Sequence, residues 1–145
     1  MNKKFLFVPI VIAIGLIILN FSEDSEDTKS NIVFHETLAD PDIYVDGIYS
    51  KKFHIESGEY YFRFVPNGSS PEILSIWITG KNVNFSNDYM LEGTLQETGI
   101  SEYYTWEYMG DKSLTILESE EITITIDPNG NKRGSVSVDI LQNNL

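Results

Sequence analysis

Apolar and polar residues alternate through most of the chain beyond residue 31, and this period of two restricts the possible folds more than any other feature. Ile122, Ile124 and Ile126 are separated by threonines. Successive side chains of a strand point to opposite faces, so this pattern predicts a strand with one buried face. Similar segments occur at 32–38, 49–55, 59–65, 74–78, 104–108, 114–116 and 136–140. About seven to nine such strands predict an all-β, two-layer antiparallel β-sandwich, either immunoglobulin-like or jelly-roll.

Turn residues separate these segments. Asp127-Pro128-Asn129-Gly130-Asn131 predicts a hairpin or a short loop between the last two segments, because Pro presets one turn dihedral and Asn-Gly tolerates positive φ. Glu56-Ser57-Gly58 predicts a turn in the same way. Asp127, Asn129 and Asn131 also have the first spacings of a calcium loop, but Lys132 stands where that loop needs glycine, so a turn explains them better.

An apolar run from Phe5 to Leu19 follows Lys3 and Lys4 at the start of the chain. A helix over residues 5 to 21 spans about 25 Å, close to the roughly 30 Å hydrocarbon core. No A-x-A-like cleavage cue follows, so we expect a retained single-pass anchor with its N-terminus cytoplasmic, and secretion after signal cleavage is the alternative. The expected divisions are an anchor at 1–21, an acidic flexible linker at 22–31 and an extracytoplasmic domain at 32–145.

The stretch from Phe53 to Phe64 (FHIESGEYYFRF) places an apolar strand, a glycine turn and an aromatic-rich strand in succession. It resembles the hairpin of emp24/GOLD-like and pre-peptidase C-terminal sandwich modules. That resemblance implies a non-catalytic accessory or binding module and carries over no functional residues. The basic start, apolar helix and β-domain are also a little similar to pilin-like filament subunits, although Phe5 directly follows Lys4 and Pro9 would interrupt the helix.

The chain offers little reactive chemistry. It has no cysteine and two histidines, His35 and His54, both in predicted strands and outside any catalytic motif. We therefore expect no enzyme and no cofactor. A copper site with both histidines and a methionine, a weak oxygen-ligand site at Asp40, Asp42 and Asp46, and a carbohydrate-active carboxylate pair remain alternatives.

Charge restricts the possible partners. Eighteen acidic residues from Glu36 to Asp139 face seven lysines and arginines. Nucleic acid and anionic lipid are poor partners for such a domain, whereas a cationic partner or divalent ions suit it better. Solubility alone also explains the charge.

The segment 103–108 is the best candidate for recognition. Alternation places Tyr104, Trp106 and Tyr108 on one face, which is either core or an outward platform for sugar rings or a protein. Trp77 and Tyr61 lie opposite the expected inward sets of their strands and would extend such a surface. Asn67 and Asn84 begin N-x-Ser sequons and are possible glycosylation sites.

These observations predict a membrane-anchored, extracytoplasmic β-sandwich that acts as a non-catalytic binding or accessory module at the cell envelope. The expected partners are the membrane, through the N-terminal helix, and a protein or envelope glycan. Alternatives are a carbohydrate-active or metal-binding surface protein and a filament subunit.

Overall fold

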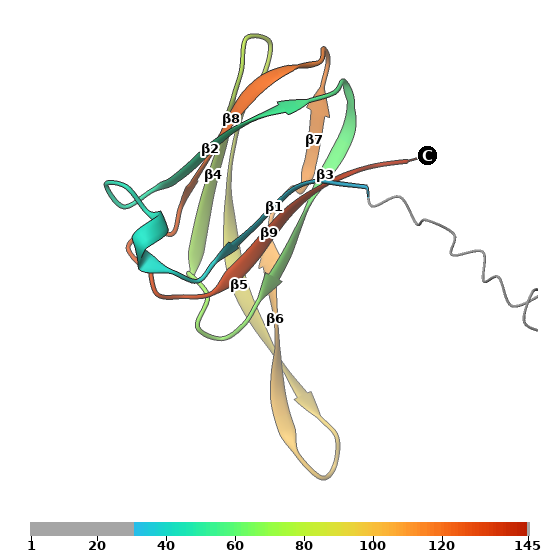
Figure 1. Cartoon of the computed structure of the whole chain (residues 1–145). Helices are drawn as coiled ribbons and strands as arrows, with labels where there is room; N and C mark the ends of the chain where they lie inside the picture. The colour runs from blue at the N-terminus through green and yellow to red at the C-terminus, as the bar shows by residue number, and fades with distance from the viewer. Residues whose placement is uncertain (1–30, 145) are drawn as a thin grey trace, which may run out of the picture. The chain divides into compact units, whose positions relative to one another are not determined.

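The computed structural model describes residues 31–144, which form two antiparallel sheets packed face to face (Figure 1). One sheet has the strand order β1-β9-β3-β7 and the other β2-β8-β4-β5-β6. The predicted β-sandwich is therefore confirmed. The elements are β1 (Ile32–Leu38), η2 (Pro41–Ile43), β2 (Tyr49–Ile55), β3 (Gly58–Pro66), β4 (Ile73–Thr79), β5 (Asn84–Glu97), β6 (Glu102–Met109), β7 (Ser113–Ile116), β8 (Glu120–Asp127) and β9 (Val136–Gln142).

The strands pair in a nested order. β1 pairs with β9, β2 with β8, β3 with β7, and β4 with β5. The chain therefore behaves as one long hairpin that has been rolled up, so that strands far apart in sequence become neighbours. β9 completes the first sheet by pairing with β3 on its other side, and β8 pairs with β4 in the second.

The core lies between the sheets and is built from the alternate residues that the sequence pattern indicates. Ile122, Ile124 and Ile126 of β8 face it from one sheet, and Val138 and Ile140 of β9 face it from the other, all of them buried. Each such side chain contributes about 1.5–3 kcal/mol on burial. Phe62, Phe64, Phe85 and Tyr89 add an aromatic cluster with ring centroids 4.7–6.0 Å apart.

Two segments expected to form turns are crossovers between the sheets, and at Asp127–Asn131 the short loop is the correct one of the two predicted alternatives. β8 and β9 belong to different sheets, so Asp127–Asn131 is a loop and not a hairpin turn. β2 and β3 also lie in different sheets, so the segment 53–64 does not form the hairpin on which the resemblance rested. Local turn chemistry is the same for both kinds of connection. Sheet membership depends instead on the distant strand with which each segment pairs.

The expected anchor at 1–21 and nearly all of the expected linker lie outside the described residues. Asn31, which was assigned to the linker, donates a hydrogen bond from its side-chain nitrogen to the Gln142 carbonyl at 2.9 Å. Within residues 31–144, no helix combines the length and hydrophobicity needed to cross a bilayer.

Candidate functional site

The β5–β6 hairpin projects beyond the rest of the sandwich (Figure 1). β5 is longer than any other strand of the described region, and its outer half pairs with β6 alone. We call residues 92–107, from Glu92 through the tip to Glu107, the arm. Ile100 at the tip is 98% exposed. A two-stranded ribbon has marginal stability in water, so its projection without a covering layer marks the arm as a candidate contact surface.

The inner face of the arm continues the core face of the sheet. Tyr108 pairs with Leu91, Trp106 with Gly93, and Tyr104 with Leu95, in that order toward the tip. Tyr108 is fully buried, Trp106 is half-buried and Tyr104 is 57% exposed. The aromatic triplet is thus core at one end and surface at the other, because the strand leaves the sandwich along its length.

Tyr108 fixes the buried end of this strip. Its hydroxyl donates to the Pro71 carbonyl at 2.5 Å. Burial, with a smaller contribution from nearby Tyr44, raises the pKa of Tyr108 far above its usual value. The group therefore stays neutral at ordinary pH and is a structural anchor for β6.

The indole ring of Trp106 packs against the backbone of two glycines. A Cβ atom at Gly93 would lie 2.7 Å from the indole ring, and one at Gly68 would lie 3.1 Å from it. Gly93 therefore has to lack a side chain for the ring to lie where it does, whereas a side chain at Gly68 would require the ring to shift slightly. Tyr104 lies beside it, with ring centroids 5.7 Å apart and planes inclined by 30°. This packing holds the exposed part of the strip in a defined orientation.

Trp106 also lines two hollows. A cleft of about 490 Å³ lies between β3 and β6 and includes Tyr61, Phe64 and Tyr108. A second hollow of about 470 Å³ includes Gly68, Met90 and Leu91. The half-buried indole therefore borders two hollows that a partner can enter.

Carboxylates lie directly opposite one another in the arm. Glu92 pairs with Glu107 on the outer face, and Glu97 pairs with Glu102 on the inner face, next to Leu95 and Tyr104. Like charges opposite each other destabilise a strand pair. The arm contains no lysine or arginine, and Glu107 has an ion pair at 3.0 Å with Lys112 beyond it. The arm is therefore an acidic ribbon with an apolar strip.

The five residues of the expected recognition surface do not all lie together. Tyr61, Trp106 and Tyr108 line the first cleft, and Tyr104 contacts Trp106. Trp77 is on the outer face of β4, the opposite face of that sheet from the strip, and is 38% exposed. The sequon residues Asn67 and Asn84 are both exposed.

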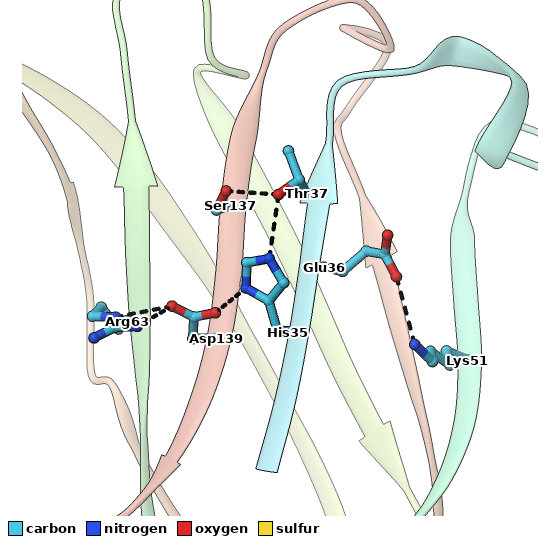
Figure 2. A network of polar contacts seen from close by, with 7 residues as sticks. All are labelled: His35, Glu36, Thr37, Lys51, Arg63, Ser137 and Asp139. Atoms are coloured by element: carbon cyan, nitrogen blue, oxygen red, sulfur yellow. Dashed lines mark hydrogen bonds and ion pairs between the residues drawn. The ribbon is translucent and has the colours of Figure 1, made fainter. Parts of the chain in front are cut away.

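A second group of polar residues forms a row across β1, β9 and β3 on the outer face of their sheet (Figure 2). Asp139 is only 2% exposed because His35 and Arg63 cover it from the neighbouring strands. His35 Nδ1 lies 2.5 Å from Asp139 Oδ1, and Arg63 donates to Oδ2 from Nε at 2.9 Å and from Nη2 at 2.6 Å. Asp139 faces outward as alternation predicts, yet its neighbours bury it.

The row has the residue types of a hydrolytic triad but lacks its close contact between base and nucleophile in this structure. Thr37 Oγ1 lies 3.5 Å from His35 Nε2, beyond the 2.6–3.2 Å reach of a base and its nucleophile, and it lies 2.9 Å from Ser137 Oγ. Arg63 holds the second carboxylate oxygen, and the row lies on the open side of a sheet. Its evident role is to tie three strands together.

The histidines cannot share a metal ion. His35 faces outward from the β1 sheet, and His54 faces outward from the β2 sheet, where its Nε2 lies 3.1 Å from Glu56 Oε1. The copper hypothesis is therefore wrong. Among residues 31–144 there is no cluster of His, Asp and Glu side chains suited to a metal, and Asp40 instead caps η2 by accepting from the Asp42 amide at 2.9 Å.

Sequence reasoning missed the opposed glutamates and the buried Asp139. Both features depend on how neighbouring strands are aligned. Glu92 and Glu97 are recognised as members of opposed pairs only when β5 is aligned with β6. The spacing Glu92, Glu97, Glu102, Glu107 is symmetric about the Thr98–Ser101 turn, and that symmetry is the signal that would have indicated the pairs.

Comparison with known proteins gives no relative: no protein-family model, no curated protein and no solved structure matches this chain.

Proposed function

We propose that this chain is a membrane-anchored, non-catalytic binding module whose β-sandwich faces outward and holds a protein partner through the arm. The observation that carries the proposal is the apolar strip that runs from buried Tyr108 to exposed Tyr104. Apolar surface that is continuous with a core but uncovered marks an interaction site. Half-buried aromatic residues are the side chains that contribute most to protein interfaces.

The apolar run at 5–19 behind Lys3 and Lys4 supports the anchor and the orientation. An anchored domain meets its partner beside the membrane. The acidic surface also supports the exclusion of nucleic acid as a partner.

We also infer that the sandwich is a jelly roll and not an immunoglobulin-like fold. The nested pairing of β1 with β9, β2 with β8, and β3 with β7 supports this choice, because a rolled hairpin of two Greek keys is the jelly-roll arrangement. β6 is then an additional edge strand, and the arm is an elaboration of the fold.

A protein partner is preferred over a glycan because the strip ends in the Glu97–Glu102 pair, whose charge a basic side chain of a polypeptide can complement.

The test is gentle detergent extraction of the full chain from its native membrane, followed by identification of the retained polypeptides and glycans. A Leu95→Ser/Tyr104→Ser variant removes the exposed part of the strip. The matched control, Val33→Ser/Trp77→Ser, removes similarly exposed apolar residues from β1 and β4, and neither residue lines a hollow beside Trp106.

A stoichiometric polypeptide that the control retains and the arm variant loses is the expected result. Retention by both variants, or recovery of glycan without any polypeptide, overturns the proposal.

A further inference from the structure

We propose that the arm binds a cationic, extended polypeptide segment that adds as a strand to the free edge of β6. This inference rests on the proposed function and names the chemistry of the partner. β6 pairs with β5 and with no other strand of residues 31–144, so one edge of it is open. Open edges present unpaired backbone donors and acceptors, and an added strand satisfies them.

The cleft between β3 and β6 lies where the added segment would leave the body of the sandwich. It is lined by Phe64 on one side and by Trp106 and Tyr108 on the other. Cα atoms of β3 and β6 approach within 8 Å, yet the two strands form no ladder. The near end of the segment therefore has a cleft that receives a side chain, and its far end lies along the arm.

The opposed glutamates determine the charge of the occupant. Glu92 and Glu107 lie together on the outer face, and Glu97 and Glu102 lie together on the inner face. A second copy of this chain would bring more carboxylates to the same place, since its 22 acidic residues exceed its 10 basic ones. On the outer face Lys112 already pairs with Glu107 at 3.0 Å, so a lysine or arginine of the segment would chiefly relieve the repulsion between Glu97 and Glu102 on the inner face.

The register gives a sequence pattern for the segment. A strand antiparallel to β6 would place a basic residue opposite Glu107, apolar residues opposite Trp106 and Tyr104, and a basic residue opposite Glu102. Alternation sends the residue opposite Glu107 to the outer face and the other three to the inner face. The expected pattern is therefore basic, apolar, any, apolar, any, basic.

The experiment measures binding of a synthetic peptide, Thr-Lys-Val-Thr-Val-Thr-Lys-Thr, to the full chain in detergent micelles. We expect saturable binding that weakens as salt rises, and no binding of the same peptide with glutamate in place of lysine. A Glu97→Gln/Glu102→Gln variant should bind about two- to tenfold more weakly, the range for exposed ion pairs. An Asp42→Asn/Glu121→Gln control removes the same charge from the body and should bind as the parent does.

Backbone methylation separates strand addition from simple charge attraction. One probe is N-methylated at the valines and a second at the threonines between and after them. An added edge strand uses alternate amides, so one probe should bind and the other should lose binding by at least tenfold. Equal behaviour of the two probes overturns strand addition.

Self-association would also overturn the inference. It would appear as a concentration-dependent dimer that Glu97→Gln/Glu102→Gln strengthens. A partner that co-purifies through the arm while the lysine peptide fails to bind would sink this inference and leave the proposed function intact.

Discussion

The body of the sandwich and the arm use the same alternation of residues, but only the body buries it. Tyr108 and Tyr104 lie on one face of β6, four residues apart, yet Tyr108 is fully buried and Tyr104 is 57% exposed. The body has a second sheet opposite, and the outer arm has none. The comparison shows that the alternation of apolar residues identifies which side chains share a face of a strand. Whether that face is buried depends on what packs against it.

The largest difference should appear when an aliphatic side chain is truncated in each region. Ile124→Ala should lower the free energy of unfolding by about 2–5 kcal/mol, because it leaves a cavity in a closed core. Leu95→Ala, in the arm, should change it by less than about 0.5 kcal/mol. Denaturant unfolding followed by Trp77 fluorescence in a Trp106→Phe background measures the free energy of unfolding of both variants. Equal losses in the two variants would contradict the distinction between body and arm.

The polar row gives a smaller expected effect. Asp139→Ala should lower the free energy of unfolding by about 1–3 kcal/mol, because charge-assisted hydrogen bonds from His35 and Arg63 are lost. The cost should be less than that of Ile124→Ala, since both partners are about half exposed and can hydrate. Removing an exposed carboxylate by Glu121→Ala is the control, and the same small change in both variants would contradict a structural role for the row.

Alkaline pH should weaken the body through its buried tyrosines. Burial is the main cause that raises the pKa of Tyr89 to about 12, and it raises those of Tyr49 and Tyr108 further. Above about pH 10 the unfolded chain has lost protons that the folded chain keeps, so the free energy of unfolding should fall between about pH 10 and 12. The free energy of unfolding should decline less steeply with pH over this range for Tyr89→Phe than for the parent. An unchanged decline would show that Tyr89 does not contribute to the loss of stability at alkaline pH.

Shortening the arm should also have only a small effect on stability. Replacing residues 95–104 with Asn-Gly keeps the Thr94–Thr105 pair, which is of the same hydrogen-bonded type as the Thr98–Ser101 pair that closes the natural turn. The free energy of unfolding should change by less than about 1 kcal/mol, because little core is removed. Binding of the lysine peptide should be abolished. A large loss of stability would show that the arm belongs to the folding unit after all.

Most strands could be predicted because their signal is local. Ile122, Ile124 and Ile126 indicate a buried face without knowledge of any partner, and β1 and β2 have the expected boundaries. β5 was not predicted, since its inner face includes Asn87 and Gly93, which do not look like core residues. The absence of a side chain at Gly93 is explained only by the ring of Trp106, which lies opposite it on β6.

The candidate site could be predicted only in part, because it depends on pairing. Trp106 and Tyr104 were identifiable as a shared aromatic face, but their change from core to surface follows from where the opposite sheet stops. The burial of Asp139 requires alignment of His35 and Arg63 with it across more than 70 residues of sequence each. Alternation predicts the direction of a side chain and gives no information about such distant neighbours.

The nested strand order also restricts when this domain can fold during synthesis. β9 lies between β1 and β3, so the first sheet cannot form until residues 136–142 have been made. Until then both neighbours keep open edges, and closing the long intervening loop is slow. A nascent chain would keep these strand edges open to unwanted pairing until β9 has been made. Ribosome stalling before residue 136 should therefore yield an aggregation-prone product in which the first sheet is incomplete.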